Sequence, residues 1–429
     1  MQKDKIHIIG IGGTGMNGVA QLAAHAGYQV SGSDRATGLP IFQSLESLGI
    51  CIVPQDGSGI TADTAAVVYS TAIESDNPDI QKAKLLNIPL LHRADMLVRL
   101  CENKEVIAVA GTAGKSTVTG LLGWIFQCLD KDPTVYCGAI MNNVGASVRY
   151  GTGPWIIEAD ESDRSFLKFH PHHAIITNIA EDHFSLNELH RLFAQFESQV
   201  SGVVIKPDPP RPAATPPQRG LEKEILPPLK SPPLEGWPQA GVGCTLLGKH
   251  NAENIRNALA LCQALGLDMQ KCIEAVQSFK GIERRLERHG SKVIDDFAHS
   301  PVKIAAALEA ASSEFPAFSA YWRPHGYTPL FQGLDAFVEC FSTFSHARPA
   351  CKFFILPVYF AGGTVNIKIT SEQFVEKLTA AGVPAEFVTD YATLEARLTE
   401  EGLPVLGMGA RDPELPLFAK RLAAKMNRT

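Results

Sequence analysis

Residues 110–120 read AGTAGKSTVTG, a glycine-rich stretch with a lysine followed by two hydroxyl side chains. Lys115 can reach the outer phosphates of a nucleotide, and the Ser116 hydroxyl can ligate magnesium. The common phosphate-binding loop has a glycine five residues before the glycine that precedes its lysine, but here that position is Val109. An apolar segment precedes the loop and a helical pattern follows it. We therefore predict a strand–loop–helix unit whose backbone N–H groups hold anionic oxygens.

Two acidic stretches follow apolar, strand-like segments further along the chain. EADESD, residues 158–163, comes after PWII, and NIAEDH, residues 178–183, comes after HHAIIT. Carboxylate oxygens are ligands that magnesium prefers. Ligands of parallel sheets bind at the carboxyl ends of the strands, so both stretches are expected near the phosphate loop. A solvated strand end is the alternative for either stretch taken alone.

A second glycine-rich turn lies near the start of the chain. GIGGTGMNG, residues 10–18, contains glycines at 10, 12 and 15, and Asp34 ends the next strand-like segment. This spacing is typical of turns that hold a pyrophosphate, with the acidic residue near a ribose. By itself the pattern also fits a nicotinamide dinucleotide, or a tight turn without any ligand.

The elements that must position these residues alternate between strand and helix, which predicts an α/β protein with parallel sheets. We predict three domains: a Rossmann-like domain over 1–100, a central domain with a phosphate-loop sheet over 101–280, and a second Rossmann-like domain over 281–429. Between Pro207 and Pro238 there are eleven prolines. Such a density is unsuited to central strands and helix interiors, so we predict a connector or surface excursion.

Composition narrows the class of protein. Hydrophobic residues make up 45% and charged residues 20%, and the formal net charge is −6. This charge argues against a general nucleic-acid binder. We expect no signal peptide and no membrane span, because the start is charged and Pro357 interrupts the richest apolar stretch. Nine dispersed cysteines without a C-x-x-C pair indicate reduced thiols, and hence a cytoplasmic protein.

Taken together, the motifs resemble the Mur ligase family, and within it the branch that joins L-alanine to UDP-N-acetylmuramate. The resemblance runs along almost the whole chain, in order, and the family's ATP loop has this shorter form. Two of the motifs, GKHNAEN and DDFAHSP, would by themselves be read as a helix cap and a turn. The stretches that carry the resemblance are GIGGTGM, SGSD, STAIESDNPDIQKAK, IPLLHRADML, GTAGKST, EADESD, TNIAEDH, GKHNAEN, GIERR, DDFAHSP, RPHGYT and GMGARD.

The resemblance implies an ATP-dependent, ADP-forming ligase of peptidoglycan precursor synthesis or recycling that activates a lactyl carboxylate as an acyl phosphate. Its partners would be UDP-N-acetylmuramate or a related UDP-sugar and an amino acid or short peptide, and its cofactors ATP and Mg²⁺, or Mn²⁺ in its place. The implied catalytic residues are Lys115, Glu158 and His183, and the implied metal ligands are Ser116, Glu158 and His183. ATP would lie on Thr112, Ala113, Gly114, Lys115, Ser116, Thr117, His250, Asn254, Arg285 and Asp295. The UDP-sugar would lie on Gly12, Gly13, Thr14, Gly15, Met16, Asp34, Ser70, Thr71 and Arg93.

The acceptor would contact His299, Arg323 and His325. In this segment the family carries arginines where the chain has Gly326 and Pro329, which makes the acceptor the open part of the prediction. Two alternatives to the ligase remain. One is a ligase-like protein that binds nucleotide or UDP-sugar in a regulatory role, without turnover or with another acceptor. The other is a nicotinamide dehydrogenase, which leaves GTAGKST and EADESD without a role.

Overall fold

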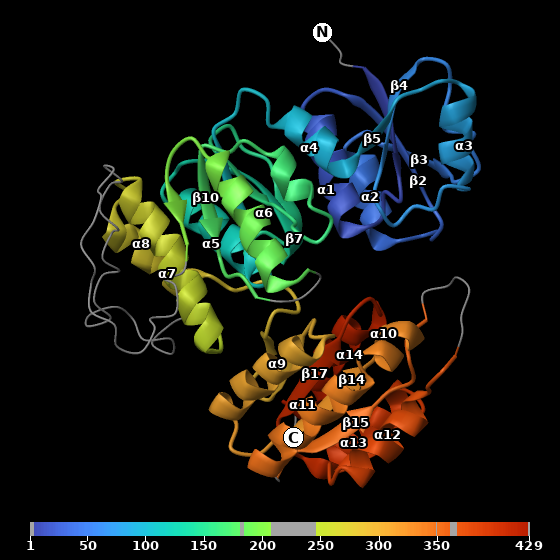
Figure 1. Cartoon of the computed structure of the whole chain (residues 1–429), viewed down its shortest axis with the longest axis vertical. Helices are drawn as coiled ribbons and strands as arrows, with labels where there is room; N and C mark the ends of the chain where they lie inside the picture. Colours follow the sequence, from blue (N-terminus) through green and yellow to red (C-terminus); the bar gives the residue numbers. More distant parts are fainter. Residues whose placement is uncertain (1–3, 181–183, 207–245, 349, 361–366, 428–429) are drawn as a thin grey trace. The chain divides into compact units, whose positions relative to one another are not determined.

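The computed structural model describes residues 4–180, 184–206, 246–348, 350–360 and 367–427. The chain forms two compact units, Met1–Trp237 with Glu253–Lys280, and Pro238–Ala252 with Gly281–Thr429. The first unit holds two sheets and the second holds one (Figure 1). The proline-rich segment predicted as a connector lies outside the described residues. Within the described part of the chain, every helix is too short or too polar to cross a membrane.

The N-terminal sheet has five parallel strands in the order β3-β2-β1-β4-β5. The strand order reverses between β1 and β4, and ligands of such sheets bind at the carboxyl ends of the strands at such a point. The strands are β1 (Lys5–Ile9), β2 (Gln29–Asp34), β3 (Cys51–Pro54), β4 (Thr64–Tyr69) and β5 (Leu90–His92). The helices are α1 (Thr14–His25), α2 (Pro40–Ser47), α3 (Pro78–Leu85) and α4 (Arg93–Leu100).

The second sheet has the order β11-β10-β6-β9-β7-β8, and only β8 runs antiparallel to its neighbour. All five residues of β6 are buried, as expected of a central strand covered on both faces. The strands are β6 (Val106–Ala110), β7 (Thr134–Met141), β8 (Ala146–Arg149), β9 (Trp155–Glu158), β10 (His173–Ile176) and β11 (Val204–Ile205). The helices are α5 (Lys115–Cys128), η1 (Ser165–Lys168), α6 (Leu186–Ser198), α7 (Lys249–Ala264) and α8 (Met269–Ser278).

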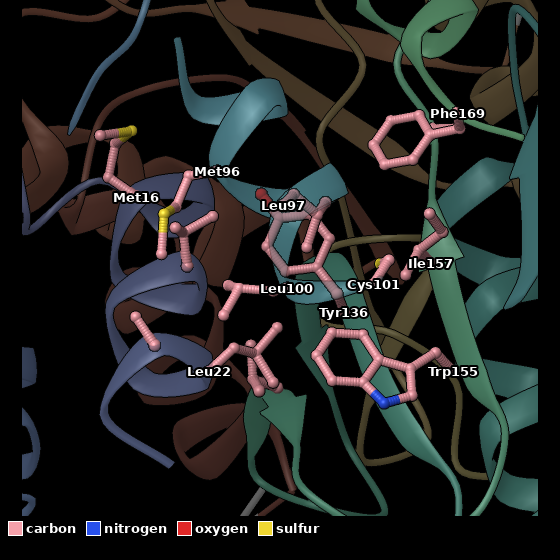
Figure 2. Close-up of a cluster of buried hydrophobic side chains, with 14 of the residues drawn as sticks. Met16, Leu22, Met96, Leu97, Leu100, Cys101, Tyr136, Trp155, Ile157 and Phe169 are labelled. Atoms are coloured by element: carbon pink, nitrogen blue, oxygen red, sulfur yellow. The ribbon is translucent and has the colours of Figure 1, made fainter. Parts of the chain in front are cut away.

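One hydrophobic cluster joins these two sheets. Met16 and Leu22 on α1 and Leu97 on α4 belong to the same buried cluster as Tyr136 on β7 and Trp155 on β9. Figure 2 shows Tyr136 and Trp155 beside the side chains of α1 and α4. Burial of apolar area therefore fixes the first glycine-rich turn, at the start of α1, close to the second sheet.

The third sheet has the order β12-β13-β17-β14-β15-β16, parallel except for the β12–β13 pair. Its strands are β12 (Glu287–His289), β13 (Val293–Asp296), β14 (Ser319–Arg323), β15 (Lys352–Ile355), β16 (Ala385–Phe387) and β17 (Val405–Gly409). Its helices are α9 (Pro301–Glu314), α10 (Tyr327–Gln332), α11 (Leu334–Ala347), α12 (Ser371–Ala380), α13 (Tyr391–Glu401) and α14 (Glu414–Met426).

The predicted α/β class with three mostly parallel sheets is confirmed. Strands β3, β7, β8, β11, β12 and β14 were not predicted from the sequence, although β14 is a central strand of the third sheet. The domain boundaries at residues 100 and 280 stay predictions; in the structure the two N-terminal sheets share one compact unit.

Candidate active site

The phosphate loop connects β6 to α5. Gly111 and Gly114 have φ angles of +135° and +80°, a region that residues with a Cβ rarely adopt. A Cβ on Gly114 would also lie 2.5 Å from Asn254 Oδ1, so α7 packs directly against the loop. Asn178 Oδ1 accepts hydrogen bonds from the Ala113 N–H at 2.8 Å and from the Thr112 hydroxyl at 3.1 Å. The loop is thus held in one shape from both sides.

Lys115 points toward a buried carboxylate. Its Nζ donates to Glu161 Oε2 at 2.6 Å and to the Gly111 carbonyl at 2.8 Å. The two side chains are 14% and 4% exposed. Burial by itself lowers the pKa of Lys115, but the negative charges of Glu161, Asp160 and Glu158 outweigh burial and raise it. Burial raises the pKa of Glu161, and the ammonium group only partly offsets this effect. Lys115 is therefore a fixed cation at the loop.

Glu158 ends β9 beside the loop. Its Oε1 accepts a hydrogen bond from the Ser116 hydroxyl at 3.1 Å, and its Oε2 accepts one from the Gly138 N–H at 2.6 Å. The structure thereby brings together two of the three predicted metal ligands, and both offer hard oxygen donors, which fit Mg²⁺. His183, the third, lies outside the described residues.

The first glycine-rich turn connects β1 to α1. The Ser33 carbonyl accepts hydrogen bonds from the N–H groups of Gly10 and Ile11. Asp34 Oδ2 accepts one from the Gly12 N–H at 2.9 Å, so this carboxylate holds the turn itself. Gly13, Thr14 and Thr71 are exposed, and Ser70 is half-buried. The Met16 side chain is buried in the core (Figure 2), which leaves its backbone as the part nearest a ligand.

Arg93, the first residue of α4, lies against this turn. A Cβ on Gly15 would collide with its guanidinium. Arg93 Nη1 donates to the Tyr136 hydroxyl at 3.4 Å, and Nη2 lies 3.9 Å from Asp160 Oδ2. A cavity of about 180 Å³ opens here, lined by Gly15, Arg93, Ala94, Leu97, Tyr136, Gly138, Glu158, Asp160, Ser165 and Phe169. The first turn and the carboxylate beside the phosphate loop therefore face one cavity.

Asp295, predicted to contact a ribose, is 0% exposed. Arg284 Nε donates to its Oδ2 at 2.9 Å, and Arg284 Nη2 approaches its Oδ1 at 3.4 Å. Burial raises the pKa of Asp295 to about 7, against the effect of Arg284. This geometry is that of an internal ion pair and does not support a ligand contact. The half-buried Asp296, beside Arg285 and His250, is the carboxylate better placed for that role.

The three predicted acceptor residues lie in the second unit. The rings of His299 and His325 are 5.0 Å apart, so the structure brings these two together. Burial lowers the pKa of His299 to about 4, and burial also lowers that of His325. Arg323, at the end of β14, forms an ion pair with Asp412 and donates to the Pro357 carbonyl at 3.2 Å.

Several residues that shape the site were not predicted from the sequence. Asp160 and Glu161 belong to EADESD, and Asn178 belongs to the other acidic stretch. The motifs therefore predicted the region of the site but not the role of each of these residues. Nothing in the sequence around Tyr136 predicts a role at the site, because YCG matches no known motif and the residues that Tyr136 contacts are distant along the chain. Asp412, from GMGARD, was not assigned a role either.

Comparisons with known proteins identify the family of this chain. Residues 5–105 match the Mur ligase family, catalytic domain. A UDP-N-acetylmuramate–L-alanine ligase of Burkholderia multivorans is 33% identical over 94% of this chain and 95% of its own length. The crystal structure of UDP-N-acetylmuramate-alanine ligase from Thermotoga maritima aligns over 99% of both chains with a TM-score of 0.75 and 26% identity. A murein peptide ligase of Psychrobacter arcticus, 18% identical with a TM-score of 0.63, shares the fold. On the strength of the identity and coverage of its relatives, the chain belongs to the Mur ligase family.

Proposed function

We propose that this chain is an ATP-dependent, ADP-forming ligase that joins an amino acid or short peptide to the lactyl carboxylate of UDP-N-acetylmuramate, in peptidoglycan precursor synthesis or recycling. One observation carries the proposal. The turn that would hold the UDP group and Glu158, which lies beside the phosphate loop, line the same cavity. A sugar carboxylate can therefore meet the γ-phosphate of ATP while its nucleotide stays on the first turn.

The reaction has two steps in this proposal. The carboxylate oxygen attacks the γ-phosphorus, ADP leaves, and an acyl phosphate forms. The acceptor amine then attacks the carbonyl carbon, and the tetrahedral intermediate collapses to the amide with loss of phosphate and a proton. Lys115 exchanges Glu161 for the γ-phosphate and stabilises the charge that develops on its oxygens. The glycines of the loop let backbone N–H groups approach the β-phosphate.

The metal-binding residues fit Mg²⁺. Ser116 and Glu158 present oxygen atoms 3.1 Å apart, and Glu158 is already oriented by the Gly138 N–H. When bound, Mg²⁺ would neutralise phosphate charge and orient the γ-phosphate for attack. We assign His183 to the same role from the family resemblance.

The remaining assignments follow the same resemblance. His250 and Asn254 are four residues apart on α7, so they share a face of that helix and are proposed adenine contacts. Arg285 is proposed to contact a phosphate and Asp296, in place of Asp295, a ribose. We assign His299, His325 and Arg323 to the acceptor. We place the reaction in the cytoplasm, where ATP and UDP-sugars are available.

A binding protein without turnover is the second candidate. The intact set of Lys115, Ser116 and Glu158, each with the contacts described above, favours turnover. A dehydrogenase would give these three residues no role, although the first glycine-rich turn by itself fits a nicotinamide cofactor.

An ADP-release assay tests the proposal. UDP-N-acetylmuramate, MgATP and single amino acids or short peptides are supplied together, and each is omitted in turn. We expect ADP release, and a new amide detected by mass spectrometry, only when all three are present. Binding of UDP-N-acetylmuramate without ADP release with any acceptor would favour the second candidate. An absorbance change of a nicotinamide cofactor would favour the dehydrogenase.

A further inference from the structure

Tyr136 connects the second sheet to the first glycine-rich turn. Its ring is buried on β7, and its hydroxyl donates to the Gly15 carbonyl at 3.0 Å. The same oxygen accepts from Arg93 Nη1 at 3.4 Å. Figure 2 shows Tyr136 in the same buried cluster as Leu97 on α4 and Trp155 on β9. A phenol buried in this way has few orientations, because its hydroxyl must find a partner.

The face of α1 beside this ring is built from glycine. A Cβ on Gly18 would lie 2.9 Å from the Tyr136 ring, and a Cβ on Gly15 would lie 3.3 Å from its hydroxyl. A side chain at Gly18 would collide with the Tyr136 ring and with Val148, and one at Gly15 would displace the Arg93 guanidinium. The close approach lets one hydroxyl reach the backbone of the first turn of α1, directly after the glycine-rich loop.

The hydroxyl of Tyr136 also fixes the direction of Arg93. The guanidinium lies between that hydroxyl and Asp160, whose Oδ2 is 3.9 Å from Nη2. Burial raises the pKa of Tyr136, so the phenol keeps its proton and remains a donor to Gly15. Arg93 therefore faces the cavity as an oriented cation, suited to a phosphate oxygen.

We propose that Tyr136 is a positioning residue for the nucleotide sugar: it holds the Gly15 end of the turn and aims Arg93 at the pyrophosphate of UDP-N-acetylmuramate. The inference rests on the proposed function, since it concerns the same cavity. Both hydrogen-bond partners of the hydroxyl belong to the nucleotide-sugar side of that cavity. The effect of removing the hydroxyl should therefore fall on the sugar substrate and spare ATP.

The test compares Tyr136→Phe with Tyr150→Phe in the full chain. Tyr150 also packs on α1, with its ring stacked on His25 at 4.4 Å, but it is 46% exposed and lies at the other end of the helix. We expect Tyr136→Phe to weaken UDP-N-acetylmuramate binding about three- to tenfold in calorimetry, the effect of one hydrogen bond. The KM of this variant for UDP-N-acetylmuramate should rise by the same factor, while its kcat and its KM for ATP stay within about twofold of the wild-type values. Tyr150→Phe should match the wild type.

The outcomes separate this inference from the function on which it rests. A wild-type chain that does not bind UDP-N-acetylmuramate overturns both. A wild-type chain that binds it, with Tyr136→Phe equally tight, overturns the inference alone. An equal rise of both KM values, with a lower melting temperature, would show that Tyr136 only supports the fold and would also overturn it.

A double-mutant cycle with Arg93→Gln tests how the hydroxyl acts. If Tyr136 works partly by aiming Arg93, the two substitutions together should cost less binding than the product of their separate effects. If the loss of affinity in the double variant equals the product of the two single losses, Tyr136 does not act by orienting Arg93.

Discussion

Lys115 Nζ lies 2.6 Å from Glu161 Oε2, and both groups are almost completely removed from solvent. The lysine of the phosphate loop therefore has a carboxylate partner before any nucleotide arrives. Removing one member of a buried ion pair leaves the other charge uncompensated, which is costly. ATP can replace that carboxylate with its own phosphate charge.

The first prediction concerns Glu161→Gln. Without ATP, the variant should melt several degrees below the wild type, because Lys115 loses its neutralising partner. Saturating MgATP should stabilise the variant more than the wild type, since phosphate then supplies the missing charge. Thermal denaturation with and without MgATP measures both effects. Equal nucleotide-induced shifts in the two proteins would contradict this role of Glu161.

Lys115→Ala should abolish turnover while leaving UDP-N-acetylmuramate binding nearly unchanged. Its contact with the γ-phosphate is made mainly in the transition state, so its loss should cost about 10²-fold or more in rate. Lys206→Ala, which removes a surface partner of Glu197, is the matched control. Calorimetry and ADP release give the two readouts. A parallel fall of sugar affinity and turnover would mean that the two sites are wrongly assigned.

Glu158→Gln should raise the magnesium concentration needed for half-maximal activity by about tenfold or more, because a charged oxygen ligand becomes neutral. The amide can still accept the Gly138 N–H, so the local structure should persist. Glu197→Gln serves as the control, since Glu197 pairs with Lys206 at the surface. A metal titration that is unchanged in Glu158→Gln would leave this residue as a structural strand end.

The pKa of His299 predicts a pH dependence of stability. Burial, together with the charges of Lys303 and His325, lowers its pKa to about 4 in the folded chain, against 6.5 as the ordinary value. Between these values the unfolded chain binds a proton that the folded chain does not. The stabilising contribution is therefore complete above pH 6.5 and is lost as the pH falls toward 4.

His299→Gln should accordingly show a shallower loss of unfolding free energy between pH 6.5 and 4 than the wild type. Denaturant unfolding at several pH values measures the slope. His346→Gln, an exposed histidine of the same unit, should keep the wild-type slope. If His299→Gln and the wild type have the same slope, His299 titrates normally in the folded protein.

A last prediction concerns the acceptor. Gly326 has a φ of 165°, an extended conformation that any residue adopts, and the nearest atom to an added Cβ is Pro329 Cδ at 3.2 Å. Gly326→Arg combined with Pro329→Arg is therefore compatible with the backbone. The two introduced guanidinium groups can each donate two parallel hydrogen bonds, so they should bind the carboxylate of L-alanine and lower its KM about ten- to a hundredfold. Gly326→Lys with Pro329→Lys adds the same charge without the paired donors of a guanidinium group, and it should lower the KM for L-alanine less. A wild-type KM well below millimolar would show that the pocket already holds the carboxylate.

The sequence by itself determined the α/β class and the two glycine-rich turns. Alternation of apolar and helical segments is a local property, and residues of the turns are adjacent in the chain, so Gly12, Gly114 and Lys115 could be found by spacing. Strands β7 and β14 were missed, because TVYCGAIM and SAYWR carry no turn signal of their own and become strands only through their neighbours in the sheet.

Only the tertiary structure decided which polar residues meet. Tyr136 lies 121 residues from Gly15 along the chain, and Glu161 lies 46 from Lys115, yet each pair is within hydrogen-bonding distance. Such contacts depend on how apolar faces pack, which no local pattern encodes. Packing also gave two adjacent carboxylates different surroundings. Asp295 is buried against Arg284, while Asp296 stays half-buried beside Arg285. The reason is that successive residues of a strand point to opposite faces of the sheet.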